Sequence, residues 1–229
     1  MKRRGFSLIE LVFAIVVIAI SLMTVPLMLN QGAKSNQFAL MQESILAAHT
    51  KMGNILSFKW DENSGDNNDT IVRVLDVTAG DSQLDRKTAV RRVGHIHDDL
   101  RRRMQDSETN ATSLGALGIE VADLYDDIDD FNGKSVIVAP VGAATQKGKF
   151  DYLDADLNLT TSVTYISDDV NYSQQDIAFD FNASDVITAG SSNIKMVELN
   201  ATSVNSDIPF VFRMFSSNIG QSKLYERVK

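Results

Sequence analysis

The most regular feature of the sequence is an apolar run near the N-terminus. Residues 6–29 span 24 positions, Glu10 is the single ionisable side chain among them, and residues 11–20 are all apolar. A helix of 24 residues is about 36 Å long, enough to cross a hydrocarbon core of about 30 Å with some tilt. The pattern therefore predicts a transmembrane helix over residues 6–29.

Beyond this run the pattern becomes amphipathic and keeps a helical period to about residue 59. Apolar side chains recur every three or four positions, which places them on one helix face. We expect residues 30–59 to continue the same helix and to bury this stripe against a globular head. A coiled-coil partner is the alternative, although fewer than four heptads are present. The stripe consists of Phe38, Met41, Ile45, Ala48, Met52 and Ile55.

The rest of the chain reads as a loop followed by strands. Residues 60–69 are polar after Trp60, which is typical of a loop. Residues 70–77 are rich in branched apolar side chains and predict a strand. Polar and apolar side chains alternate over residues 157–165 and 176–181, and the run 194–199 alternates with a slip that suggests a bulge. Residues 209–215 place three apolar side chains on one face. The pattern predicts an α+β fold, in which a long N-terminal helix packs on an antiparallel sheet.

Composition narrows the possible classes. The 229 residues carry 22 Lys+Arg against 30 Asp+Glu, a net charge of −8, and 44% of them are hydrophobic. These values exclude a disordered chain and a multi-span membrane protein, and they argue against a generally basic nucleic-acid binder. The chain has no Cys, which excludes disulfides, thiol nucleophiles and Cys-based metal sites. No pattern of Ser, His and Asp indicates a catalytic site, so we do not expect an enzyme.

The distribution of charge orients the predicted helix. Lys2, Arg3 and Arg4 precede the apolar run and are expected to stay in the cytoplasm, which places residues 30–229 on the far side of the membrane. A cleaved secretory signal peptide is the alternative interpretation. Its cleavage site would be Ala19-Ile20-Ser21, which fits the usual pattern loosely, and the apolar run continues to residue 29.

Glu10 points to a more specific interpretation, since a carboxylate inside a membrane helix is costly and indicates a functional site. The segment around it, Lys2-Arg3-Arg4-Gly5-Phe6-Ser7-Leu8-Ile9-Glu10, resembles the type IV prepilin signature. In type IV pilins and type II secretion pseudopilins, a short basic leader ends in Gly and precedes Phe, a few small or apolar residues, Glu and a long apolar helix. The resemblance implies that a prepilin peptidase cuts between Gly5 and Phe6 and methylates the new amine of Phe6.

The same resemblance implies a fold, a location and partners. Residues 1–5 become the leader, residues 6–29 the filament-core helix, residues 30–59 its amphipathic half, and residues 60–229 a periplasmic or extracellular head. Glu10 would pair with the Phe6 amine of a neighbouring subunit, and Pro26 matches a proline that is common in the family. We expect Pro26 to kink or locally unwind the helix.

In this interpretation the chain is first a single-pass protein of the bacterial inner membrane, in contact with its lipid. It then joins a pilus or pseudopilus as a structural subunit. Its implied partners are prepilin peptidase, other pilin or pseudopilin subunits and the inner-membrane assembly platform. The large head favours a minor subunit. The absence of Cys separates the chain from the disulfide-looped pilins.

Three features of the head allow other chemistry. The basic segment 86–103 supports the alternative of a filament-tip subunit that captures DNA or a surface ligand, although no aromatic residue interleaves its arginines. Residues 123–133 hold five carboxylates beside an Asn-Gly turn and could bind calcium, although the EF-hand order is absent. Part of this run is similar to a stretch of minor pilins of the mannose-sensitive haemagglutinin type. His95 and His97 lack a third zinc ligand, so we expect no metal there.

Overall fold

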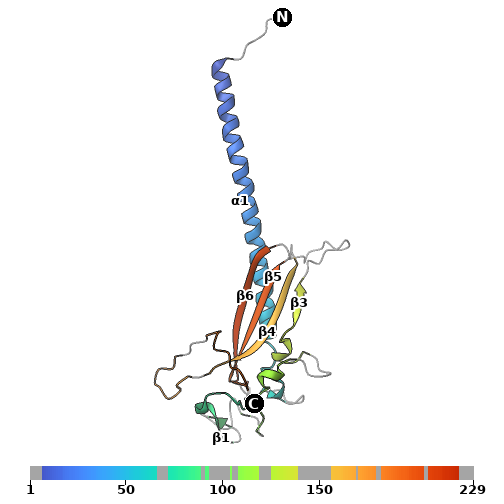
Figure 1. Ribbon diagram of the computed structural model, residues 1–229, viewed down its shortest axis with the longest axis vertical. Helices are drawn as coiled ribbons and strands as arrows, with labels where there is room; N and C mark the ends of the chain where they lie inside the picture. Colours follow the sequence, from blue (N-terminus) through green and yellow to red (C-terminus); the bar gives the residue numbers. More distant parts are fainter. Residues whose placement is uncertain are drawn as a thin grey trace, which may run out of the picture.

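The computed structural model describes residues 7–65, 72–88, 91–92, 104, 108–118, 125–138, 156–168, 170–178, 182–203 and 206–221. A single long helix, α1 (Leu8–Ile55), rises out of a head built around a four-stranded sheet (Figure 1). The strands of this sheet are β3 (Ser135–Val138), β4 (Leu157–Ile166), β5 (Ile194–Ser203) and β6 (Ser206–Ser217). The fold is α+β and pilin-like, as the sequence predicts.

Short elements occupy the end of the head away from the projecting half of α1. They are the strands β1 (Arg86–Thr88) and β2 (Arg91–Arg92) and the 3₁₀ turns η1 (Glu62–Ser64), η2 (Ser82–Leu84), η3 (Leu114–Ala116) and η4 (Asp129–Phe131). β1 and β2 pair antiparallel in a small sheet of their own. Figure 1 shows β1 at the lower end of the head.

The sheet is an antiparallel meander in the order β3-β4-β5-β6. Strands β4 and β5 pair without a register shift from Leu157 opposite Ser203 to Ile166 opposite Ile194. The side chains of β4 alternate between buried and less buried over most of its length, which confirms the predicted alternation. The pairing of β5 with β6 shifts between Ala201 and Ser203.

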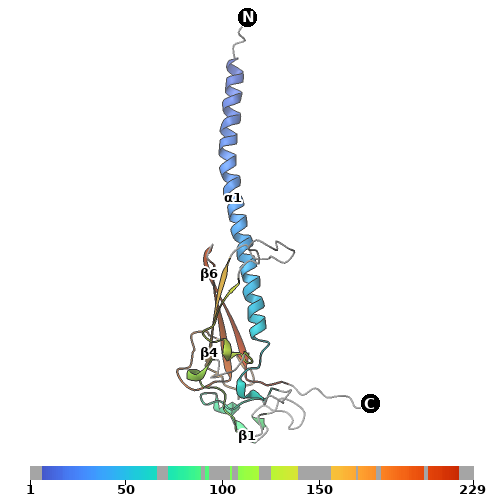
Figure 2. The ribbon, with the colours of Figure 1, turned by 90° about the vertical axis from the view of Figure 1, so that its right-hand side faces the viewer.

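The lower half of α1 lies along one face of this sheet (Figure 2). Ala48, Met52 and Ile55 are fully buried in the same apolar cluster as Leu159 and Leu199. This contact confirms that the amphipathic stripe packs on the head. The buried part of the stripe begins later in the sequence than predicted. Phe38 is 61% exposed, and Met41 is the first residue of the stripe that is at least half-buried. The helix also ends at Ile55 rather than near residue 59, because Ser57 and Phe58 hydrogen-bond to carbonyls three residues back and tighten the last turn.

Two of the strand predictions are wrong within the described residues. Residues 72–77 form only isolated bridges, at Val74 and Asp76, in place of the predicted strand over residues 70–77. Residues 176–178 form no strand, and residues 179–181 lie outside the described residues. The described part of the predicted loop after residue 60 is a loop with one 3₁₀ turn, and it starts with a buried segment, because Trp60, Asp61 and Ser64 are all buried.

The predicted slip in strand 194–199 has a different cause from a bulge. Ile194, Lys195, Met196 and Val197 are all buried, and the register with β4 is unbroken there. Both faces of β5 are covered at this point. The core lies on one side, and Ile166, Ile194 and Met196 form a second small cluster. The alternation slips because Lys195 occupies a position inside the core.

Candidate functional site

The upper half of α1 is an apolar surface without a partner in the isolated chain. Every residue from 7 to 39 is exposed, and the large apolar side chains range from Leu8 at 81% to Val16 at 48%. Among the described residues, α1 is the one helix long and apolar enough to cross a membrane. An exposed apolar surface of this extent marks a membrane or protein interaction site.

Glu10 lies in the first turn of this helix. The backbone N–H groups of Glu10 and Leu11 donate to the Ser7 carbonyl at 3.0 and 3.1 Å, so the helix begins directly after Ser7. The order Ser7-Leu8-Ile9-Glu10 also fits a capping box, in which the Ser and Glu side chains cap the first turn. The Ser7 side chain makes no such bond here, and Glu10 is exposed. The carboxylate is therefore free to meet a group outside its own helix.

The other predicted site residues are placed as follows. Pro26 lies inside α1, and the helix is continuous across it, so the chain is not unwound there; a kink stays a prediction. The proline lacks an N–H, so the helix has one backbone hydrogen bond fewer at this position. Glu10 and Pro26 are about 24 Å apart along the axis, from the rise per residue, and do not form one site. Gly5 and Phe6 lie outside the described residues.

Two arginines of the basic segment 86–103, Arg86 and Arg92, make ion pairs or hydrogen bonds within the head. Arg86 makes a two-pronged ion pair with Asp76, with Nη2 to Oδ2 at 2.7 Å, and both side chains are largely buried. Arg92 donates to the Asn193 side chain and to the Asn218 carbonyl, each at 3.0 Å, and burial lowers the pKa of its guanidinium. Residues 101–103, His95 and His97 lie outside the described residues.

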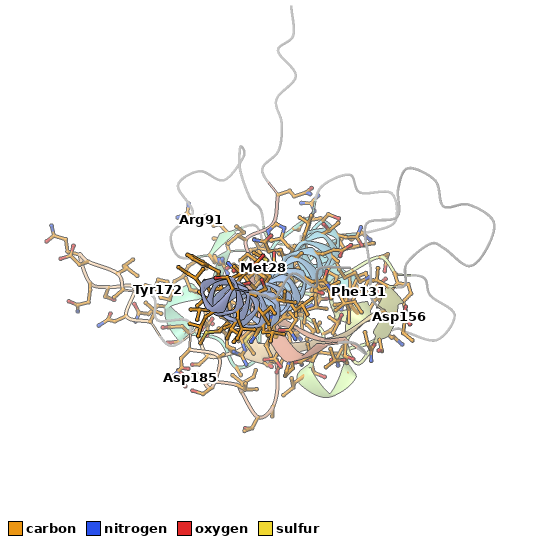
Figure 3. All side chains as sticks on the ribbon, turned by 90° about the horizontal axis from the view of Figure 1, so that it is seen from above. Met28, Arg91, Phe131, Asp156, Tyr172 and Asp185 are labelled. Carbon is orange, nitrogen blue, oxygen red and sulfur yellow. The ribbon has the colours of Figure 1, made fainter. Side chains whose placement is uncertain are left out.

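Phe131 of the acidic run and Arg91 of the basic segment lie on different sides of the head (Figure 3). Viewed from above along α1, Phe131 lies on one side of the helix, whereas Arg91 and Tyr172 lie on the opposite side (Figure 3). Within the acidic run, Asp127, Asp129 and Asp130 are buried. No group of three or more metal-ligating side chains is arranged to hold a metal among the described residues. Calcium binding therefore stays a prediction from the sequence.

Asp127 and Asp130 accept hydrogen bonds from backbone N–H groups of the same run. Oδ2 of Asp130 accepts from the backbone N–H groups of Asp126 and Asp127 at 2.8 and 3.1 Å. Oδ1 of Asp127 accepts from the N–H groups of Asp129 and Asp130 at 2.8 and 3.1 Å. The run therefore folds into a tight turn held by its own side chains, which explains why so many Asp residues are clustered here.

A buried lysine connects this turn to the end of α1, and the sequence interpretation missed it. Nζ of Lys195 donates to the Trp60 carbonyl at 2.6 Å, to Asp61 Oδ2 at 3.0 Å and to Asp129 Oδ1 at 2.7 Å. The side chains of all three ionisable residues are at most 1% exposed. The available signal was a single Lys inside the apolar run 194–199, where a buried cation requires acidic partners.

Comparison with known proteins supports the N-terminal part of this description. Residues 1–25 match the prokaryotic N-terminal methylation motif. No curated protein and no solved structure matches the chain. The motif is that of type IV pilin-like proteins, which are processed by prepilin peptidase and assemble with other pilins. With its motif, its long apolar helix and its antiparallel sheet, this chain carries the N-terminal signature and the architecture of the type IV pilin and pseudopilin family.

Proposed function

We propose that the protein is a structural, minor subunit of a type IV pilus-like or type II secretion filament. The observation that carries this proposal is the division of α1 into two parts. One face of its lower part is buried on the head, at Ser44, Ala48, Met52 and Ile55, whereas residues 7–39 are all exposed. A helix that is apolar all round needs either lipid or other helices to cover it.

The membrane supplies that cover before assembly. With Lys2, Arg3 and Arg4 in the cytoplasm, residues 6–29 span the inner membrane and the head, residues 60–229, lies in the periplasm. Prepilin peptidase removes residues 1–5 and methylates Phe6. The inner-membrane platform then transfers the subunit into the filament, where neighbouring helices replace lipid around residues 6–29.

Glu10 directs the packing of these helices. Glu10 is an exposed carboxylate in the first turn, four positions after Phe6 in the sequence. When the helix is buried in a filament, an unpaired carboxylate is strongly unfavourable. Pairing with the Phe6 amine of a neighbouring subunit removes this penalty only at the correct axial register. The same pair therefore gives both affinity and alignment.

The test uses the full chain in a host that assembles its filament. Glu10→Ala is expected to be cleaved and to stay in the membrane fraction, but to be missing from sheared filaments. Gly5→Leu is expected to keep its leader, which the mass of the N-terminal peptide detects. Glu108→Ala, a change of an exposed carboxylate in the head, is the matched control and should assemble normally. Normal incorporation of Glu10→Ala together with normal cleavage of Gly5→Leu would refute the proposal.

The alternative function is capture of DNA or a surface ligand at the filament tip through residues 86–103. Arg86 and Arg92 are engaged with Asp76, Asn193 and Asn218, so this function would depend on residues 101–103. Its test is a salt-dependent DNA affinity of the full chain that disappears when Arg101, Arg102 and Arg103 are replaced by Gln.

A further inference from the structure

The Lys195 cluster has the composition of a reactive site as well as that of an ion pair. An amine and a carboxylate lie 2.7 Å apart, from Nζ of Lys195 to Oδ1 of Asp129, with a second carboxyl group next to them on Asp127. Lys195 and Asp129 are 66 residues apart in the sequence, on β5 and η4. Two reacting groups that the fold fixes at this distance have a very high effective concentration relative to each other.

The two carboxylates on Lys195 are not equivalent. Asp61 is held by three further donors, namely the N–H groups of Asn63 and Thr112 at 3.1 and 3.0 Å and Thr112 Oγ1 at 3.2 Å. These donors engage both oxygens of Asp61, so neither oxygen is free to leave. Oδ2 of Asp129 is buried and has no hydrogen-bond partner among the described residues. Asp129 is therefore the carboxyl group that can be protonated and lose an oxygen.

Asp127 is placed to supply that proton. Burial, and then the negative charge of Asp129, raise the pKa of Asp127 to about 8, so its carboxyl group carries a proton at neutral pH. Its Oδ1 accepts two backbone N–H groups, whereas its Oδ2 has no partner among the described residues. The acidic proton is thus available to the neighbouring carboxyl group of Asp129.

Aromatic rings enclose the amine and keep water away. Nζ of Lys195 lies 4.5 Å from the ring centre of Trp60 and 5.6 Å from that of Tyr165. The Tyr165 hydroxyl is itself turned to the Thr112 carbonyl, at 2.7 Å. A dry site lowers the penalty for moving a proton from the ammonium to a carboxylate, because it removes the solvation that favours the two charges. It also protects an amide product from hydrolysis.

We propose that Lys195 and Asp129 condense into an intramolecular isopeptide bond. Nζ passes one proton to the Asp129 carboxylate and its lone pair attacks Cγ of Asp129, while Asp127 gives the leaving oxygen its second proton. The Cγ–O bond breaks, the N–C bond forms, and Asp127 recovers a proton from the nitrogen. In total, one ammonium and one carboxylate give one amide and one water, so the step needs no oxidant, reductant or cofactor.

The bond would act as a covalent staple in a chain that has no disulfide. It ties the central strand β5 to η4, directly beside Trp60 and Asp61, where the chain leaves α1. A cross-link between distant segments limits the freedom of the unfolded chain and so stabilises the folded one. This inference concerns the head alone and stands or falls independently of the proposed assembly function.

The deciding experiment is mass spectrometry of the full chain, purified in detergent. The wild-type mass, corrected for the N-terminal processing seen in the N-terminal peptide, is expected to be lighter than the sequence mass by one water. Trypsin should release one branched peptide that contains both Asp129 and Lys195. A measured mass equal to the sequence mass, with no loss of water, refutes the proposal. So does a water loss in which the two peptides are found separately, because a cyclised Asp also loses water.

Three variants identify the groups, with circular dichroism to check folding. Lys195→Arg keeps the positive charge and should show no loss of mass. Asp127→Asn keeps the reacting pair and should slow bond formation, leaving most chains unreacted. Asp129→Asn should still react, with release of ammonia, and give a product of the same mass as the wild type. If the wild type gives the branched peptide and none of the three variants loses it, the bond does not join Lys195 to Asp129. If a variant fails to fold, the wild-type mass and peptide alone decide whether the bond forms.

Discussion

Lys195 on β5 and Asp61, six residues beyond the end of α1, meet through Nζ and Oδ2 at 3.0 Å, and both side chains are fully buried. This contact ties the exit of the long helix to the centre of the sheet. Trp60 adds a second tie, because its indole N–H donates to the Ser216 carbonyl of β6 at 3.1 Å. A pull along α1 is therefore transmitted to the two strands β5 and β6.

Replacing Asp61 is expected to destabilise the head strongly. Asp61→Ala removes the acceptor of the N–H groups of Asn63 and Thr112 and one of the three acceptors of the buried Lys195 ammonium. We expect the free energy of unfolding to fall by about 3–5 kcal/mol, as for other broken buried networks. Denaturant titration of the full chain in detergent, followed by tryptophan fluorescence, measures it.

The control for Asp61 is a charged pair at the surface. Glu198 and Arg213 also pair across neighbouring strands, at 2.7 Å, but the Arg213 side chain is 45% exposed. Glu198→Ala should cost at most about 1 kcal/mol, since exposed ion pairs contribute little. Equal costs for the two variants would contradict a structural role for the Lys195 cluster.

The boundary between the two parts of α1 can be tested by a pair of apolar truncations. Met52→Ala removes a side chain that is 1% exposed and should lower the free energy of unfolding by about 2–5 kcal/mol. Phe38→Ala changes a side chain that is 61% exposed and should alter it by less than about 0.5 kcal/mol. The same titration serves for both variants. A large effect of Phe38→Ala would show that the head extends higher along α1.

The sequence predicted the features that depend on local order along the chain. The helix follows from the apolar run and the spacing of Ala48, Met52 and Ile55, and β4 follows from its alternation over residues 157–165. The N-terminal motif is also a local pattern, and its match over residues 1–25 agrees with the sequence interpretation.

The Lys195 cluster could not be predicted in the same way. It joins residues 61, 129 and 195, which only the complete fold brings together. Residues 72–77 were misread for a related reason. Val74 and Leu75 are both buried, so they resemble a strand, but among the described residues their segment finds only isolated bridges. Pairing over long sequence distances leaves no periodic trace in either case.

The basic segment is predicted to contribute to stability through Arg86. Arg86→Ala breaks the ion pair with Asp76 and should lower the free energy of unfolding by about 1–3 kcal/mol, the range for charged hydrogen bonds. Lys87→Ala, at the exposed neighbouring position, should have little effect. Thermal unfolding of the two variants in parallel gives the comparison. An Arg86→Ala variant as stable as the wild type would contradict this role of the ion pair.

Asp127 is expected to make the stability of the head depend on pH. Its pKa is raised to about 8 in the folded chain, whereas an unfolded Asp titrates near about 4. Below about pH 4 both states carry the proton and Asp127 adds no pH dependence. Between about pH 4 and about pH 8 the folded state binds more protons than the unfolded state. The free energy of unfolding should therefore fall as the pH rises, by at most about 1.4 kcal/mol per pH unit, and level off above about pH 8.

Substitution separates this contribution from all other titrating groups. Asp127→Asn mimics the protonated carboxyl group, so the slope of stability against pH should become flatter by the amount that Asp127 contributes. The absolute stability is not the readout, because the variant also changes the chemistry at Lys195. Asp156→Asn, at an exposed position, is the matched control and should keep the wild-type slope. Denaturant titrations at several pH values give the slopes, and an unchanged slope in Asp127→Asn would show that this carboxyl group is ionised in the folded head at neutral pH.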